Sequence, residues 1–247
     1  MPRKSILILS GILVFVLAAC SGQSPAEKMY DHLEEAVTQE KGFAEQQQPL
    51  VELEKKEKDL YNEIITLGME EFDQVKTLSE EALGLIDQRE ELLASEKESI
   101  ESAKSEFDKV ESLVEELEDD KVQTTATEMM GVMDERYQAY QELNESYQSA
   151  LEQDRKLYEM LQDESLQEEE LKEQIDVINA NYDKVISANE SFNQKTEDYN
   201  QLKQDFYNQA DLNVEYERQV ENESDNQGDA DSDSKEDDHE QDSKKAE

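Results

Sequence analysis

The spacing of apolar residues most constrains what this chain can fold into. Between residues 50 and 206 apolar side chains recur three or four positions apart, and no proline follows Pro49. This is the spacing of amphipathic helices, which bury one stripe and expose the rest to water. The most regular part alternates steps of four and three residues, which is typical of bundle packing. It comprises Leu171, Ile175, Ile178, Tyr182, Val185, Asn189, Phe192, Thr196, Tyr199 and Phe206.

Two polar residues, Asn189 and Thr196, interrupt this stripe. Polar side chains at such core positions cost stability and help to fix the register of packed helices. We therefore expect both side chains to lie on the seam between helices.

The first helix has a clear start in the sequence. Ser24 is a suitable N-cap, Pro25 occupies the first helical position and Glu27 completes a capping box. We expect this helix to end near Gly42, because glycine commonly ends helices. The apolar pattern starts again around Pro49.

Three longer helices are expected to follow. The second extends from about residue 46 to 118, with a bend near Gly84 or near Ser95, where a capping-box pattern recurs. The third covers 122–162, and residues 162–165 form the turn that leads into the fourth. Short turns between long helices favour antiparallel neighbours, so the sequence predicts an all-α, elongated up-and-down bundle with coiled-coil-like packing. An extended intermolecular coiled coil is the alternative.

The charge balance excludes several classes of partner. The chain has 24 Lys and Arg residues against 65 Asp and Glu residues, a formal net charge of −41. Such a surface repels nucleic acid and anionic lipid headgroups. Hydrophobic residues make up only 35% of the chain, which suits narrow helices better than a thick globular core. Any contact with a membrane must therefore be covalent or hydrophobic.

The amino terminus resembles a bacterial lipoprotein signal. A basic start and an apolar run lead to the lipobox Leu17-Ala18-Ala19, followed by Cys20. We expect cleavage between Ala19 and Cys20, diacylglycerol on Cys20, and a membrane held through that lipid, since two acyl chains suffice for stable anchoring. Cleavage would take the formal net charge from −41 to −43, because the leader carries Arg3 and Lys4. An ordinary signal with an unlipidated Cys20 is the alternative.

Composition divides the chain into four segments. A cleaved signal peptide covers 1–19, a lipidated tether 20–23, a helical bundle domain 24–220 and an acidic tail 221–247. The tail has no apolar residue larger than alanine, so it cannot bury a core and is expected to be disordered.

Candidate residues for chemistry are few. Five acidic tail residues match the spacing of a calcium loop, but Ser234 stands where the sharp turn needs glycine, so no metal site is predicted. With only His32 and His239 available, neither a zinc triad nor a Ser-His-Asp arrangement can be assembled. His32 is expected to face solvent. We predict a protein without catalytic residues and without a cofactor beyond the lipid; the calcium-like residues are Asp229, Asp231, Asp233, Asp237 and Glu240.

Tyrosines are the remaining side chains of interest. Exposed tyrosines could stack on sugars or form part of a partner interface. Their position on the apolar stripes favours core packing instead. These residues are Tyr137, Tyr140, Tyr147, Tyr182 and Tyr199.

Several short segments together resemble the YkyA-like cell-wall-binding lipoproteins of Gram-positive bacteria. The resemblance covers nearly all of the chain from Cys20 to about Tyr207 and leaves out the acidic tail. It rests on CSGQSP at 20–25, EQQQPL at 45–50, TLGM at 66–69, RYQAY at 136–140, ANESFN at 188–193 and Tyr199-Asn200.

The resemblance implies a lipid-anchored, all-helical bundle on the outer face of the cytoplasmic membrane, facing the wall. It supplies no catalytic residues. Two functions stay open: a wall-binding module that contacts peptidoglycan, and a scaffold or spacer that docks another exported envelope protein. Anionic wall polymers should repel a chain of this charge unless divalent ions bridge them. The sequence alone does not identify ligand-binding residues.

Overall fold

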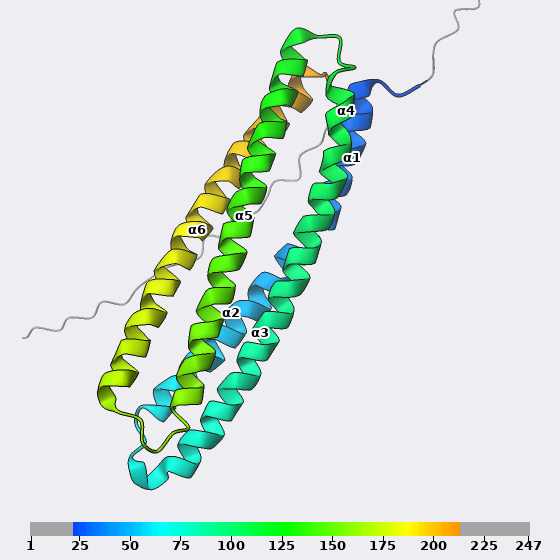
Figure 1. Ribbon diagram of the computed structural model, residues 1–247. Helices are drawn as coiled ribbons and strands as arrows, with labels where there is room; N and C mark the ends of the chain where they lie inside the picture. The colour runs from blue at the N-terminus through cyan, green and yellow to red at the C-terminus, as the bar shows by residue number, and fades with distance from the viewer. Residues whose placement is uncertain (1–21, 213–247) are drawn as a thin grey trace, which may run out of the picture. The chain divides into compact units, whose positions relative to one another are not determined.

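The computed structural model of the protein describes residues 22–212, and every regular element in that range is helical (Figure 1). The predicted all-α class is therefore confirmed. The leader, Cys20 and the acidic tail lie outside the described residues. In chain order the elements are α1 (Pro25–Gln39), α2 (Lys41–Ile64), η1 (Met69–Glu71), α3 (Phe72–Phe107), η2 (Asp108–Val110), α4 (Glu111–Val114), α5 (Asp120–Met160) and α6 (Glu168–Gln209).

The helices run up and down, as predicted (Figure 1). α1 and α2 follow each other along one side of the bundle, and α3 returns in the opposite direction against both. α5 and α6 form a second long hairpin, and α3 packs against α5 to join the two halves. Within residues 22–212, no helix is long and apolar enough to cross a membrane.

α1 ends at Gln39, close to the predicted stop near Gly42, but Gly42 itself does not end the helix. The Ser99 hydroxyl donates to the Gln39 carbonyl at 2.6 Å and accepts from the Phe43 amide at 3.0 Å. Those two backbone groups would pair directly in a continuous helix, so the inserted hydroxyl interrupts the ladder. Gly42 lies inside α2, where an added Cβ would come within 3.0 Å of the Ser99 hydroxyl oxygen. Pro49 also lies inside α2 rather than at its start.

The prediction of one helix from about residue 46 to 118 is wrong. The chain reverses between α2 and α3, at residues 65–71. The Thr66 hydroxyl donates to the Glu63 carbonyl at 2.7 Å, and the Gly68 amide donates to the Glu71 carboxylate at 3.2 Å. These bonds satisfy backbone groups that helix ends leave free. Gly84 and Ser95, the predicted bend positions, lie within α3.

The other helix boundaries agree closely with the sequence. α1 begins with the predicted capping box, in which the Glu27 amide donates to the Ser24 hydroxyl at 3.2 Å. α5 begins at Asp120, with the Asp119 carboxylate accepting from two backbone amides. α5 ends at Met160, and the turn that follows includes the predicted residues 162–165.

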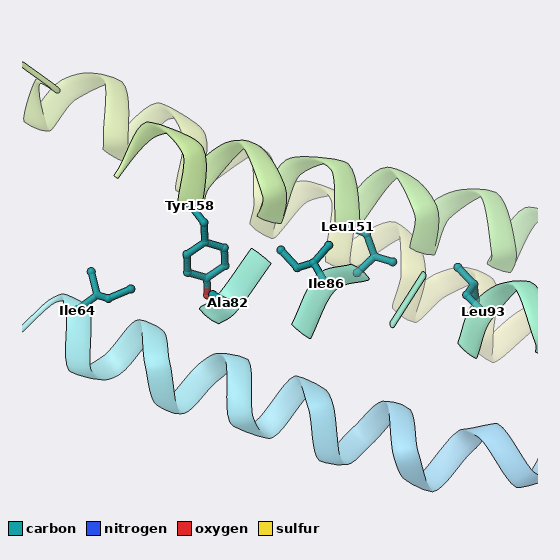
Figure 2. Close-up of a cluster of buried hydrophobic side chains, with 6 residues drawn as sticks. All are labelled: Ile64, Ala82, Ile86, Leu93, Leu151 and Tyr158. Atoms are coloured by element: carbon teal, nitrogen blue, oxygen red, sulfur yellow. The ribbon is translucent and has the colours of Figure 1, made fainter. Parts of the chain in front are cut away.

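Apolar side chains from α2, α3 and α5 form the lower part of the core (Figure 2). Ile64, Ala82, Ile86, Leu93, Leu151 and Tyr158 are buried there against one another. An upper cluster joins α3, α5 and α6. It comprises Ile100, Ala139, Tyr140, Leu143 and Phe192.

α6 is buried unevenly, which corrects the predicted seam. Phe192, Tyr199 and Phe206 are buried, whereas Ile175 and the other stripe residues up to Val185 are only partly covered. Asn189 is exposed rather than on a seam. Thr196 is partly buried and accepts a hydrogen bond from Arg136 Nε at 2.9 Å. The stripe is therefore covered less completely in the half of α6 nearest its amino terminus than in the other half.

Candidate functional site

An open groove lies between α2 and α6. Within residues 22–212 these two helices do not pack along each other, although each packs on a neighbour, α2 on α3 and α6 on α5. Two hollows of about 540 and 410 Å³ follow each other between them, and Glu54 lines both. We call these two adjoining hollows, from Phe43 to Tyr61 on α2 and from Ile175 to Glu190 on α6, the α2–α6 groove.

A single buried arginine occupies the middle of the groove. The Arg89 side chain is 1% exposed. Its guanidinium pairs with the carboxylate of Glu57, donates to Asp154 Oδ2 at 3.4 Å and donates to Glu54 Oε1 at 3.2 Å. These acids come from two other helices, Glu54 and Glu57 from α2 and Asp154 from α5. Three carboxylates thus surround one cation.

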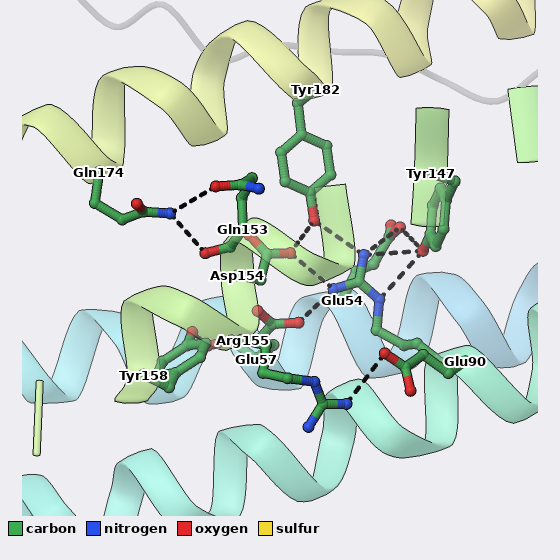
Figure 3. Close-up of polar contacts among 11 residues, drawn as sticks. Glu54, Glu57, Glu90, Tyr147, Gln153, Asp154, Arg155, Tyr158, Gln174 and Tyr182 are labelled. Atoms are coloured by element: carbon green, nitrogen blue, oxygen red, sulfur yellow. Dashed lines mark hydrogen bonds and ion pairs between the residues drawn. The ribbon is translucent and has the colours of Figure 1, made fainter. Parts of the chain in front are cut away.

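Two tyrosine hydroxyls complete the arrangement, which Figure 3 shows with α6 along the top of the view. Arg89 Nη2 donates to Tyr147 at 2.9 Å and to Tyr182 at 3.0 Å. Tyr147 in turn donates to Glu54 at 2.5 Å, and Tyr182 donates to Asp154 at 2.6 Å. The network, which we call the Arg89 cluster, joins α2, α3, α5 and α6 through hydrogen bonds that involve charged groups.

Burial controls the ionisation of the cluster. Desolvation raises the pKa of Glu57 to about 7, because the nearby positive charge of Arg89 offsets that cost only in part and Asp154 adds repulsion. Desolvation also raises the pKa of Asp154. The pKa of Glu57 therefore lies near neutral pH, where a proton on its carboxyl would relieve the repulsion from Asp154.

The upper half of the groove is more apolar. Leu50, Leu93 and Val185 line it, and Val51 and Ile186 stand on its opposite edges. Its one deeply buried acid is Glu96, 4% exposed, which accepts a hydrogen bond from Gln47 at 3.0 Å. Desolvation raises the pKa of Glu96 to about 7. The edges are apolar, and Glu96 and Gln47 are already hydrogen-bonded to each other. Such a lining suits recognition of a ligand better than bond cleavage.

Comparison with known proteins identifies the family. A family model described as "Putative cell-wall binding lipoprotein", YkyA, matches residues 24–209. The chain belongs to this family. The "Uncharacterized lipoprotein YkyA" of Bacillus subtilis (strain 168) is 34% identical over 202 residues, which cover 82% of this chain and 91% of that protein.

A solved structure supports the fold of this family member. It is a conserved protein of unknown function from Staphylococcus aureus, with a TM-score of 0.53 and 14% sequence identity. The match covers 73% of this chain and 91% of that one. At this identity the likeness shows the fold alone.

Two of the segments that carry the family resemblance border the groove. Residues 45–50 belong to α2 and include Gln47 and Leu50, which line the upper half. Residues 188–193 belong to α6 and include Asn189 and Glu190 on the facing side. The segment 66–69 forms the turn between α2 and α3 instead.

The structure places the predicted tyrosines mainly in the interior. Tyr140 and Tyr199 are buried, as core packing requires, and Tyr137 is partly buried. Tyr147 and Tyr182 are partly buried as well, but their hydroxyls belong to the Arg89 cluster. Core packing therefore accounts for only part of their role.

His32 differs slightly from the prediction of a solvent-facing residue. Its side chain is 34% exposed, and its Nδ1 atom lies 2.7 Å from Glu106. Among the described residues, no group of three or more His, Cys, Asp or Glu side chains is placed to hold a metal ion. The calcium-like tail residues, Cys20 and the lipobox lie outside the described part of the chain and stay predictions.

Sequence reasoning missed the charged residues of the Arg89 cluster, although the sequence carries a signal for Arg89 itself. The buried positions of α3 follow steps of four and three residues through Ile86, Arg89, Leu93, Glu96 and Ile100. Charged residues thus occupy two core positions of a regular stripe. A charge in that register indicates a buried partner or a functional site.

Proposed function

We propose that this protein is a lipid-anchored binding protein on the outer face of the cytoplasmic membrane, associated with the cell wall and without catalytic activity. Diacylglycerol on Cys20 anchors it, and the bundle presents the α2–α6 groove to ligands. The single observation that carries the proposal is this groove, an open hollow of ligand size between two helices that do not pack along each other. The family description supports the wall as its place of action.

Direct binding to the wall is the first candidate function. We expect the purified mature chain, residues 20–247 with Cys20 replaced by serine, to sediment with isolated peptidoglycan sacculi. Retention after removal of teichoic acid would indicate that peptidoglycan itself is bound. Comparison of Ca²⁺ with EDTA separates direct contact from bridging by divalent ions. This control is important because the mature chain has a formal net charge of −43 once Arg3 and Lys4 are removed. Absence from the pellet in every condition would reject direct wall binding.

Docking of another exported protein is the second candidate function. Val51 on α2 is 62% exposed and Ile186 on α6 is 57% exposed, and both line the upper half of the groove. Exposed apolar side chains on facing edges are a common feature of protein interaction sites. In this case the protein would associate with the wall through its partner.

The anchor itself is tested by one substitution. Cys20→Ala removes the thiol that would carry the lipid, and among residues 22–212 no helix could replace that anchor. We expect the wild-type protein in the membrane fraction and the variant in the culture medium. Immunoblots of the two fractions measure the change, with Ser21→Ala as the matched control. A variant that stays with the membrane would overturn the lipid anchor.

A further inference from the structure

The α2–α6 groove has the length and edges of a helix-binding site. From Phe43 to Tyr61 its α2 side extends about 27 Å at ~1.5 Å per residue. Val51 and Ile186 are among the most exposed large apolar side chains of the described residues, and they stand on opposite edges of the groove. An amphipathic helix laid between them would bury both on its apolar face.

The charge of the groove indicates that its ligand is positively charged. Five carboxylates line the groove against two basic side chains, Lys58 and Arg89. Arg89 is buried and fully engaged by acids and phenols of the chain itself. An anionic polymer would meet net repulsion there, whereas a cationic segment would meet complementary charge.

Glu54 is the carboxylate best placed to meet such a cation. It lines both halves of the groove and its side chain is 38% exposed, whereas Glu57 and Asp154 are buried beneath it. Its oxygen Oε1 already accepts from Arg89 and Tyr147. A carboxylate offers about four lone-pair sites, so its second oxygen can accept from an incoming Lys or Arg.

The aromatic side chains of the groove fit a sugar ligand less well. Glycan platforms need open ring faces, and the Arg89 guanidinium lies over the Tyr147 ring at 5.2 Å from its centroid. The hydroxyls of Tyr147 and Tyr182 are held inside the Arg89 cluster. Apolar edges around an acidic centre favour a protein segment instead.

We propose that the α2–α6 groove docks a basic amphipathic helix of another exported protein, with its apolar face between Val51 and Ile186 and a Lys or Arg against Glu54. This inference rests on the second candidate function, protein docking, and names the chemistry of the partner. Anchoring by Cys20 would then hold that partner at the membrane surface.

The test uses three synthetic 18-residue peptides and the mature chain, residues 20–247 with Cys20 replaced by serine. One peptide has Leu on one helical face and Lys on the other, the second is a scramble of the same composition, and the third carries Glu in place of Lys. At 150 mM NaCl we expect the amphipathic Lys peptide to bind at least about tenfold more tightly than the scramble, measured by fluorescence anisotropy. The Glu peptide should not bind.

Matched variants locate the binding site. The double variant Val51→Ser, Ile186→Ser should weaken binding of the amphipathic Lys peptide about tenfold or more, because it removes both apolar edges. Ile65→Ser is the control, since Ile65 is 58% exposed and lies outside the groove. Glu54→Gln should weaken binding further than Glu80→Gln, an exposed substitution on α3. Circular dichroism verifies that each variant is folded.

Several results would overturn the inference. Equal affinity for the scrambled peptide would show attraction to bulk charge alone, and an unchanged affinity of the double variant would place binding elsewhere. Sedimentation with sacculi, measured in parallel, distinguishes a failure of helix docking from a failure of direct wall binding. A chain that binds sacculi but not the amphipathic Lys peptide overturns helix docking and leaves direct wall binding standing.

Discussion

Replacement of Arg89 by methionine is expected to destabilise the bundle by about 3–5 kcal/mol, the cost typical of breaking a buried ion pair. Methionine fills a similar volume but leaves Glu57 and Asp154 buried without their cation. Tyr147 and Tyr182 also lose their donor. Urea unfolding at pH 7.5, followed by circular dichroism, measures the change in the free energy of unfolding. The loss should shrink toward pH 5, where the orphaned carboxylates can take up protons.

A surface arginine provides the control. Arg155 is 30% exposed and pairs with Asp87 and Glu90, which are more exposed still. Arg155→Met should cost less than about 1 kcal/mol, as is usual for exposed ion pairs. Neutralising the acids as well, in Arg89→Met, Glu57→Gln, Asp154→Asn, should recover much of the lost stability. A loss no larger for Arg89→Met than for Arg155→Met would show that the Arg89 cluster does not hold the helices together.

The helical pattern allowed most of the fold to be predicted from local signals. The capping box at Ser24 and the extent of α5 follow from residues adjacent in sequence, and the structure agrees with both. The turn at residues 65–71 was missed, although it contains Gly68. The helix-forming residues on both sides of it concealed the turn.

The site could not be predicted because it depends on contacts between distant helices. Glu54 and Asp154 contact the Arg89 side chain, although they are 35 and 65 positions away from it in the sequence. Ser99, whose hydroxyl interrupts the helix between α1 and α2, is also far in sequence from the residues it contacts. Periodicity predicted which face of α6 is apolar, but it does not say whether another helix covers that face. The groove exists because α2 does not cover the whole apolar face of α6.

Replacement of Glu96 by glutamine should stabilise the protein at pH 8 by about 3 kcal/mol. Burial raises the pKa of Glu96 from its usual 4.5 to about 7, and each pKa unit corresponds to about 1.36 kcal/mol. Between these values the folded state keeps a proton that the unfolded state releases, so this group makes stability fall as pH rises. Above pH 7 the folded chain must hold a buried carboxylate whose hydrogen-bond donor, Gln47, is neutral. Glutamine keeps an acceptor for Gln47 and carries no charge.

The pH dependence of unfolding distinguishes this effect from a general gain in packing. Urea unfolding from pH 5 to pH 8 should show a shallower loss of stability for Glu96→Gln than for the wild type, with the two chains similar near pH 5. The remaining slope would come largely from Glu57, whose pKa is raised to about 7 as well. Glu98→Gln, an exposed substitution two residues along α3, should leave the slope unchanged. Parallel curves for Glu96→Gln and the wild type would mean that Glu96 is ionised in the folded protein throughout this range and is therefore hydrated.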